Sequence, residues 1–314
     1  MMSNNIIMEY FRLIRFPLGI MAAISGLAAG FVVIRLEDPN NTSILKILSD
    51  YFLHILVGMP IPALIVWGSM AINDYYDLES DKANNRLDRP LVRNVFSPNV
   101  ALYSSIIMFI LGAFLSLVLI NIGLLAVNYM VVVFTIIFIF IAISYSTWLK
   151  KFGFLGNIGV SLSYPAAILL GGFVVGITND TVLYTIISFG LLIFFSALGR
   201  EVLKGIMDVE GDKMQGVKTI AIRYGEKNAA FFTFVLYLIS ILFAPVPLVL
   251  GFNGYLLSSI FYVGFVSLMI LINLYASMNL IKEPSKENGI KGRKLTKIGF
   301  WFAVIGYFAS ALVL

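Results

Sequence analysis

The chain alternates long apolar stretches with short polar segments along almost its whole length. Nine stretches contain no Asp, Glu, Lys or Arg, and each approaches the roughly 20 residues that a helix needs to cross the hydrocarbon core of a bilayer. They cover residues 17–34, 51–72, 100–120, 122–144, 155–177, 182–198, 229–250, 255–280 and 298–314. We therefore predict an all-α, polytopic membrane protein of nine transmembrane helices, forming one domain over residues 1–314.

Two parts of this pattern need interpretation: the boundary between the third and fourth stretches, and the segment before the first stretch. Only Asn121 separates the third stretch from the fourth. Asn121 and Gly123 are the turn signals there, and we interpret them as the turn of a tight helical hairpin. Before the first stretch, Glu9, Arg12 and Arg15 are interspersed with apolar residues. This mixture predicts an interfacial amphipathic helix within residues 1–16 and not a cleaved signal peptide.

Composition narrows the class of protein. At 60% hydrophobic and 12% charged residues, the chain has too little polar surface for a soluble enzyme or a nucleic-acid-binding domain. It has no cysteine and a single histidine, which excludes a thiolate nucleophile and a multi-histidine metal site. Any metal must be bound by oxygen atoms, and this favours Mg²⁺. We expect membrane lipids around the chain and no nucleic acid partner.

The basic residues predict the orientation. With the N-terminus inside, 20 of the 22 Lys and Arg residues fall on the inner side, and only Arg35 and Lys46 fall outside. The positive-inside rule therefore predicts a multi-pass protein of the cell membrane, with its N-terminus and the motif loops 73–93 and 200–227 on the cytoplasmic side. The Lys-rich segment 282–297 is predicted to be a solvated loop that anchors the chain at the lipid surface.

A short acidic sequence occurs twice. Asp77-Leu78-Glu79-Ser80-Asp81-Lys82 follows the second predicted helix, and Asp208-Val209-Glu210-Gly211-Asp212-Lys213 follows the sixth. Matching motifs four helices apart suggest two related four-helix halves plus a ninth helix, arranged around a central cavity.

The spacing within each motif indicates a shared chemistry. Asn73, Asp77 and Asp81 are four residues apart, so they share one face of a helix that continues out of the membrane, and Asp208 and Asp212 repeat this geometry. Carboxylates crowded beside hydrocarbon require a compensating cation. If the two motifs face each other, they can hold one or two Mg²⁺ ions, which would in turn bind a diphosphate.

Basic residues near the motifs support an anionic ligand. Five of them are expected on the same inner face and can bind diphosphate oxygens. They are Arg86, Arg89, Lys150, Arg200 and Lys204. A cation transporter has little use for so many basic groups beside its carboxylates, whereas Mg²⁺ that bridges carboxylates to a diphosphate needs both signs of charge.

These residues resemble a known family. The run from Asn73 to Asp81, followed by Arg86 and by Arg89-Pro90, resembles the NDxxDxxxD and RP signature of the UbiA superfamily of intramembrane prenyltransferases. The stretch from Arg200-Glu201 through Lys204 to Asp208 and Asp212 resembles its second signature. Tyr145 with Lys150 resembles the tyrosine and lysine element between the two, and the resemblance spans nearly the whole chain.

The resemblance implies Mg²⁺-dependent transfer of a prenyl group from an isoprenyl diphosphate to a lipophilic acceptor. It implies metal ligands at Asn73, Asp77, Asp81, Asp208 and Asp212, and diphosphate-binding residues at Asn73, Arg86, Lys150, Arg200 and Lys204. The four aspartates and Tyr145 would be catalytic. One position departs from the pattern, because Gly205 stands where relatives often have a further aspartate.

The acceptor is open at this stage. The residues of the motifs are most similar to those of the archaeal ether-lipid branch of the family, which adds a geranylgeranyl group to geranylgeranylglyceryl phosphate. Arg89, Arg200 and Lys213 would then remain for the second phosphate. An aromatic acceptor of the quinone or haem type is the alternative, and a cation transporter or a lipid phosphotransferase is the alternative from another class.

Overall fold

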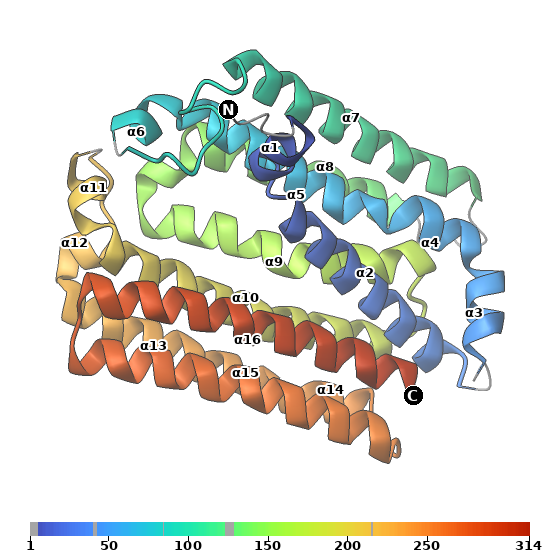
Figure 1. Ribbon diagram of the computed structural model, residues 1–314. Coiled ribbons are helices and arrows are strands. Elements are labelled where there is room, and N and C mark those ends of the chain that lie inside the picture. The colour runs from blue at the N-terminus through green and yellow to red at the C-terminus, as the bar shows by residue number, and fades with distance from the viewer. Residues whose placement is uncertain (1–5, 40–42, 84, 123–128, 215) are drawn as a thin grey trace.

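The computed structural model describes residues 6–39, 43–83, 85–122, 129–214 and 216–314, and within these ranges the regular structure is helical (Figure 1). In this part of the chain, nine helices or helix pairs are long and apolar enough to cross a membrane, as predicted. They are α2 (Phe16–Glu37), α4 with α5 (Phe52–Gly58 and Pro60–Tyr76), α7 (Pro98–Ile122), α8 (Tyr129–Thr147), α9 (Phe154–Val175), α10 (Asp180–Met207), α13 with α14 (Glu226–Phe243 and Pro245–Leu250), α15 (Leu256–Lys282) and α16 (Lys286–Leu312).

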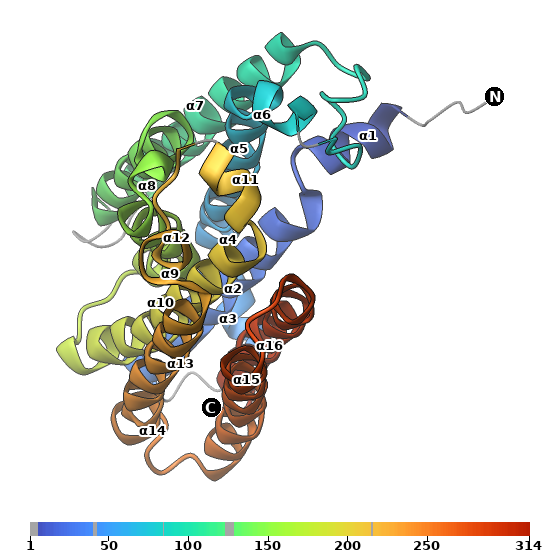
Figure 2. The same ribbon diagram turned by 90° about the vertical axis from the view of Figure 1, so that its left-hand side faces the viewer.

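Short helices lie at the ends of these spans. They are α1 (Ile6–Leu13), α3 (Ile44–Asp50), α6 (Leu78–Ala83), the 3-10 helix η2 (Leu149–Phe152), α11 (Val209–Met214) and α12 (Ile220–Tyr224). Both views place α6, α11 and α12 at one end of the bundle, which we call the motif end, and Figure 2 looks onto it. The opposite end carries α3 and α14 (Figure 1).

Proline interrupts two spans that the apolar pattern showed as continuous. The second span is divided at Met59 and restarts with Pro60, and the seventh is divided at Ala244 and restarts with Pro245. Proline cannot donate the backbone hydrogen bond that a continuous helix requires. In the predicted hairpin, Asn121 belongs to the last turn of α7, and Gly123 lies outside the described residues.

Of the three segments predicted as loops, 200–227 and 282–297 are largely helical, whereas 73–93 is helical only as far as Ala83 and continues in turns. Segment 282–297 contains the end of α15 and the first three turns of α16, and the Ser285 hydroxyl caps α16 by accepting from the Asn288 backbone N–H. Segments 73–93 and 200–227 contain α6 in the first and the end of α10, α11 and α12 in the second. Lys and Arg are good helix formers, so a helix does not end where its apolar stretch ends.

The centre of the bundle depends on a close approach between α2 and α9. The backbones meet at Gly26 and Gly171, where a Cβ atom added to Gly171 would lie only 2.0 Å from the Gly26 carbonyl oxygen. Small residues allow membrane helices to pack backbone against backbone. Helices α9 and α10 are the most buried spans, whereas α13 and α15 are the least buried and present most of their surface to lipid.

This contact gives a first prediction. Gly171→Ala should destabilise the protein by about 1–3 kcal/mol, because the added methyl group meets backbone that cannot rotate away. The measurement is the thermal unfolding midpoint in detergent. Gly264→Ala in α15 is the matched control, since no atom lies within 4 Å of its Cβ position and alanine has the higher helix propensity. Equal midpoints for the two variants would contradict the packing argument.

Candidate active site

The two acidic motifs occupy equivalent joints between helices. Asp77 separates α5 from α6, and Asp208 separates α10 from α11. Helical hydrogen bonding continues through both joints, since the Asp81 N–H donates to the Asp77 carbonyl at 2.7 Å and the Asp212 N–H to the Asp208 carbonyl at 2.8 Å. The two aspartates of each motif are therefore one helical turn apart, as their spacing predicts.

The similarity extends into the turn that follows each motif. The Arg86 N–H donates to the Asp81 carbonyl at 3.0 Å, and the Val217 N–H donates to the Asp212 carbonyl at 2.9 Å. Before these residues, Asn85 and Gly216 have positive φ angles of 50° and 69°. Asn and Gly are the residues that tolerate this left-handed conformation best. The sequence repeat is thus also a repeat of local backbone structure.

In the first motif, Asp77 lies in a polar cluster of three elements. The Asn73 amide donates to Asp77 Oδ2 at 2.9 Å, and Lys150 forms an ion pair with Asp77 Oδ1. Lys150 belongs to η2, which connects α8 to α9. Burial lowers the pKa of Lys150, and the neighbouring charge of Lys151 lowers it further. The structure therefore brings together three of the residues that the sequence singled out.

Arg89 is engaged differently from what the sequence suggested. Its guanidinium contacts Asp74 at 3.0 Å and approaches Asp81 at 3.8 Å. Asp74, which is only 1% exposed, also accepts a hydrogen bond from Arg15 at 2.7 Å. Arg89 is thus committed to carboxylates and is not left over for a second phosphate. Sequence reasoning missed the part played by Asp74, although a charged residue in an apolar helix is a signal in itself.

Arg86 lies within electrostatic range of both motifs. It forms an ion pair with Asp88 at 3.1 Å, and it lies close enough to both Asp81 and Asp208 to interact with them electrostatically. The hydrogen bond that Arg86 donates to Asp88 is the main cause that raises the pKa of Arg86, and the two motif aspartates add to it. Helices α6 and α11 lie at the same end of the bundle in both views (Figures 1 and 2). The Arg86 guanidinium therefore interacts electrostatically with one aspartate from each motif.

The second motif has the chemistry of a cation-binding site. Within the described ranges, neither Asp208 nor Asp212 forms an ion pair with a basic side chain. Burial raises the pKa of Asp212 to about 6, with Asp208 as the second cause, so the two carboxylates repel each other. No three Asp, Glu or His side chains of the described part gather closely enough to bind a metal by themselves. Carboxylate pairs still fit Mg²⁺, which usually binds to one or two carboxylates and completes its shell with water and substrate phosphates.

Glu201 organises the basic residues of α10. This buried carboxylate contacts Lys204 at 2.5 Å and Arg200 at 3.5 Å, and Arg200 also donates to the Tyr164 hydroxyl at 3.2 Å. Arg200 and Lys204 were predicted from the sequence as site residues, but Glu201 was not. The arrangement holds both cations on one side of α10, one and two turns before Asp208.

Two further positions complete the comparison with the sequence. Tyr145, near the end of α8, lies within electrostatic range of Glu201 and of the motif residue Asp212. Gly205 packs against Thr219, where its Cβ position would lie 3.5 Å from the Thr219 Cβ. The side chain of an aspartate at position 205 would therefore point toward Thr219, the N-cap residue of α12.

Comparison with known proteins shows the family of the chain. The model of the UbiA prenyltransferase family matches residues 27–304. A digeranylgeranylglyceryl phosphate synthase of Sulfolobus acidocaldarius is 35% identical over 248 residues, which cover 79% of this chain and 81% of that protein. One of the same name from Archaeoglobus fulgidus is 31% identical over 291 residues, covering 91% and 92%.

Solved structures have the same fold as this chain. A structure described as that of a digeranylgeranylglyceryl phosphate synthase in membranes superposes with a TM-score of 0.71 at 27% identity, covering 99% of this chain and all of that one. A UbiA homologue from Archaeoglobus fulgidus, bound to GPP and Mg²⁺, superposes with a TM-score of 0.61. It is 17% identical and covers 95% of this chain and 99% of its own, so this likeness shows a shared fold.

Proposed function

We propose, from the premise that the chain belongs to the UbiA prenyltransferase family, that its acceptor is geranylgeranylglyceryl phosphate and its donor geranylgeranyl diphosphate. The family makes the chain a multi-pass membrane transferase that moves a prenyl group from an isoprenyl diphosphate with the help of Mg²⁺. The acceptor rests on the names of the relatives. The main support for the active site is the pair of equivalent helix joints at Asp77 and Asp208, which lie at one end of the bundle with basic side chains near them.

We assign the metal to the two motifs. Asp77, Asp81, Asp208 and Asp212 would hold Mg²⁺ through their carboxylate oxygens, with Asn73 supporting Asp77. Bound Mg²⁺ would neutralise the negative charge that accumulates on the diphosphate as it leaves. The chain thereby supplies oxygen ligands only, in agreement with its lack of cysteine.

The basic residues would bind and orient the donor. Lys150 and Arg86 lie at the first motif, and Arg200 and Lys204 lie on α10 before the second. Hydrogen bonds from these cations to diphosphate oxygens would be charge-assisted, and they would strengthen as the leaving group gains charge. The ring face of Tyr145 would stabilise positive charge that develops on the allylic carbon. Helix walls that exclude water would protect this carbon from hydrolysis.

The acceptor phosphate requires its own cation. Of the three residues predicted for it, Arg89 is paired with Asp74, and Arg200 is held by Glu201 and Tyr164. Lys213 is exposed and, in the described part of the chain, has no ion-pair partner. We therefore assign the acceptor phosphate to Lys213, next to the second motif.

A competition assay tests the acceptor. Purified protein receives labelled geranylgeranyl diphosphate together with equal amounts of geranylgeranylglyceryl phosphate and an aromatic acid of the quinone-precursor type. We expect the label to appear in the doubly alkylated glycerol phosphate. Exclusive prenylation of the aromatic ring would reject the lipid acceptor and would leave the donor and metal sites in place.

We further propose that the motif end faces the cytoplasm, because 20 of 22 Lys and Arg residues belong to that side. The chain has no cysteine, so single cysteines report position without background. Lys286→Cys at the motif end and Ser49→Cys in α3 are both exposed positions. In intact cells, an impermeant thiol reagent should label Ser49→Cys alone and should reach Lys286→Cys only after lysis. The reverse pattern would contradict the orientation.

A further inference from the structure

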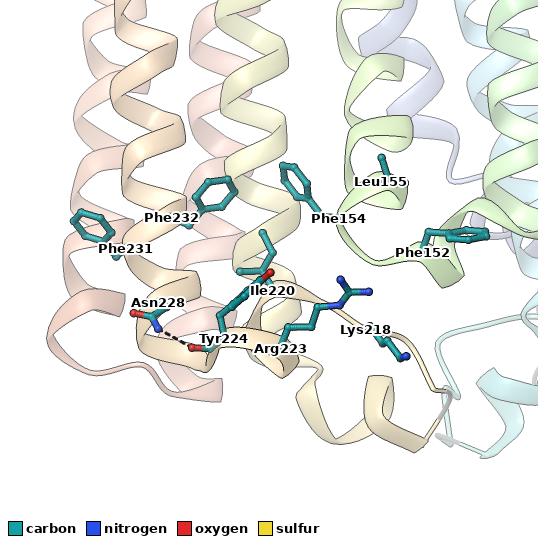
Figure 3. Close-up of a pocket in the computed structure, with 10 residues that line it drawn as sticks. All are labelled: Phe152, Phe154, Leu155, Lys218, Ile220, Arg223, Tyr224, Asn228, Phe231 and Phe232. Atoms are coloured by element: carbon teal, nitrogen blue, oxygen red, sulfur yellow. Dashed lines mark hydrogen bonds between the residues drawn. The ribbon is translucent and has the colours of Figure 1, made fainter.

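A groove lies at the motif end beside η2. It has a volume of about 590 Å³ and opens between the η2–α9 corner on one side and α12 with α13 on the other (Figure 3). We call it the α9–α13 groove and define it by Phe154, Leu155, Phe231, Phe232, Lys218 and Arg223. None of these residues belongs to the proposed metal or diphosphate site.

One part of this groove is apolar and faces the surroundings of the bundle. The rings of Phe154 and Phe232 meet edge to face at 5.5 Å across the groove. Leu155 and Phe231 are 56% and 58% exposed, although they lie in the first turns of spans α9 and α13. Exposed apolar side chains on a membrane-spanning helix are the ones expected to face lipid, so this part of the groove is accessible from the bilayer side.

The other part is basic. In Figure 3 the side chains of Lys218 and Arg223 lie below the apolar residues, between α12 and η2. Neither forms an ion pair within the described part of the chain. The backbone next to Lys218 is fixed, because its carbonyl oxygen lies 2.1 Å from where a Cβ of Gly153 would be. Two exposed cations therefore lie at the polar rim of an apolar groove.

We propose that the α9–α13 groove binds an anionic phospholipid of the bilayer. Its phosphate lies between Lys218 and Arg223, and the first part of a hydrocarbon chain lies along Phe154, Leu155 and Phe231. The charges of Lys218 and Arg223 favour an anionic headgroup, and the apolar side chains of the groove favour a hydrocarbon chain attached to that headgroup. A soluble anion lacks the chain, and a neutral lipid lacks the net charge.

The position of η2 explains why the occupant is a lipid and not the acceptor. Two side chains of this short helix have different neighbours, since Lys150 pairs with Asp77 whereas Phe152 lines the groove. A lipid in the groove thus lies on the other side of η2 from Asp77. By connecting η2 to α12, it stabilises the segment that carries Lys150 without entering the reaction.

The test compares lipids with identical chains. Delipidated protein in neutral detergent is titrated with phosphatidylglycerol or phosphatidylcholine, and the retained lipid is counted by native mass spectrometry while the unfolding midpoint is recorded. We expect phosphatidylglycerol to be retained and to raise the midpoint. Lys218→Gln/Arg223→Gln should weaken its retention about thirtyfold, at roughly fivefold for each basic residue near an anionic headgroup. Leu155→Trp, which narrows the apolar part, should weaken it as well.

The control removes two charges from another helix, α16. Lys286→Gln/Lys297→Gln changes two exposed lysines of α16 and should leave the retention of phosphatidylglycerol unchanged. Equal retention of both lipids, an equal loss in the control, or equal protection by inorganic phosphate alone would overturn the proposal. So would a raised KM for the acceptor in the groove variant, which would make the groove a substrate route. The KM for the donor should stay constant in every case, so the result does not depend on the proposed acceptor.

Discussion

Replacing Asp77 or Asp208 with asparagine should reduce turnover by at least about a thousandfold, because each change removes a charged ligand from a site that stabilises the leaving diphosphate. Both residues lie at helix joints outside the membrane spans and are not fully buried. The Asn73 amide and the backbone bonds through each joint remain. The measurement is single-turnover prenyl transfer by protein whose folding has been verified by its thermal midpoint.

The chain offers a matched control within the same motifs. Glu79 and Glu210 occupy the same position in the two repeats, and both are exposed. Among the residues that the structure describes, Glu79 pairs only with the exposed Lys82, and such surface pairs contribute little to stability. Glu79→Gln and Glu210→Gln should therefore keep nearly full activity. Retention of activity in Asp77→Asn or Asp208→Asn, or full activity of the wild type in excess EDTA, would refute the metal assignment.

The nine spans and the acidic repeat could be predicted because both depend on local sequence. A stretch of about 20 apolar residues has few alternatives to a membrane helix, and a four-residue spacing fixes the relation of Asp208 to Asp212 whatever surrounds them. Even the repeat of the turns was present in the sequence, since Asn85 and Gly216 stand at equivalent places. The division of the fold into two related four-helix halves stays a prediction.

The ion pairs could not be predicted, because they depend on which helices meet. Glu201 is adjacent to Arg200 in the sequence, but its burial follows from the packing of α10 among its neighbours. Arg89 was assigned to a phosphate because nothing in the sequence shows that Asp74 lies within 3.0 Å of it. Helix ends were misplaced for a related reason, since Ser285 caps α16 well before its apolar part begins.

The pairing of Asp74 leads to the largest expected effect on stability. Asp74→Asn should destabilise the protein by about 3 kcal/mol, because it leaves Arg15 and Arg89 facing a neutral amide in a buried position. The value is at the lower end for a broken buried pair, since the Arg15 side chain is 27% exposed. Arg15 also adopts a left-handed conformation, with φ of 49°, between α1 and α2. This costly conformation is the one from which its guanidinium reaches Asp74.

Comparison with a second aspartate separates this structural role from charge alone. Asp88 pairs with Arg86, but its side chain is 62% exposed, so Asp88→Asn should change the stability by less than about 1 kcal/mol. In detergent, Asp74→Asn should lower the unfolding midpoint by at least about 5 °C, and Asp88→Asn should leave it nearly unchanged. Equal midpoints would mean that solvent compensates Arg15 and Arg89 without Asp74. A stable but inactive Asp74→Asn would instead place Asp74 among the residues that act on the substrate, because Asp77→Asn is expected to lose activity while it keeps its midpoint.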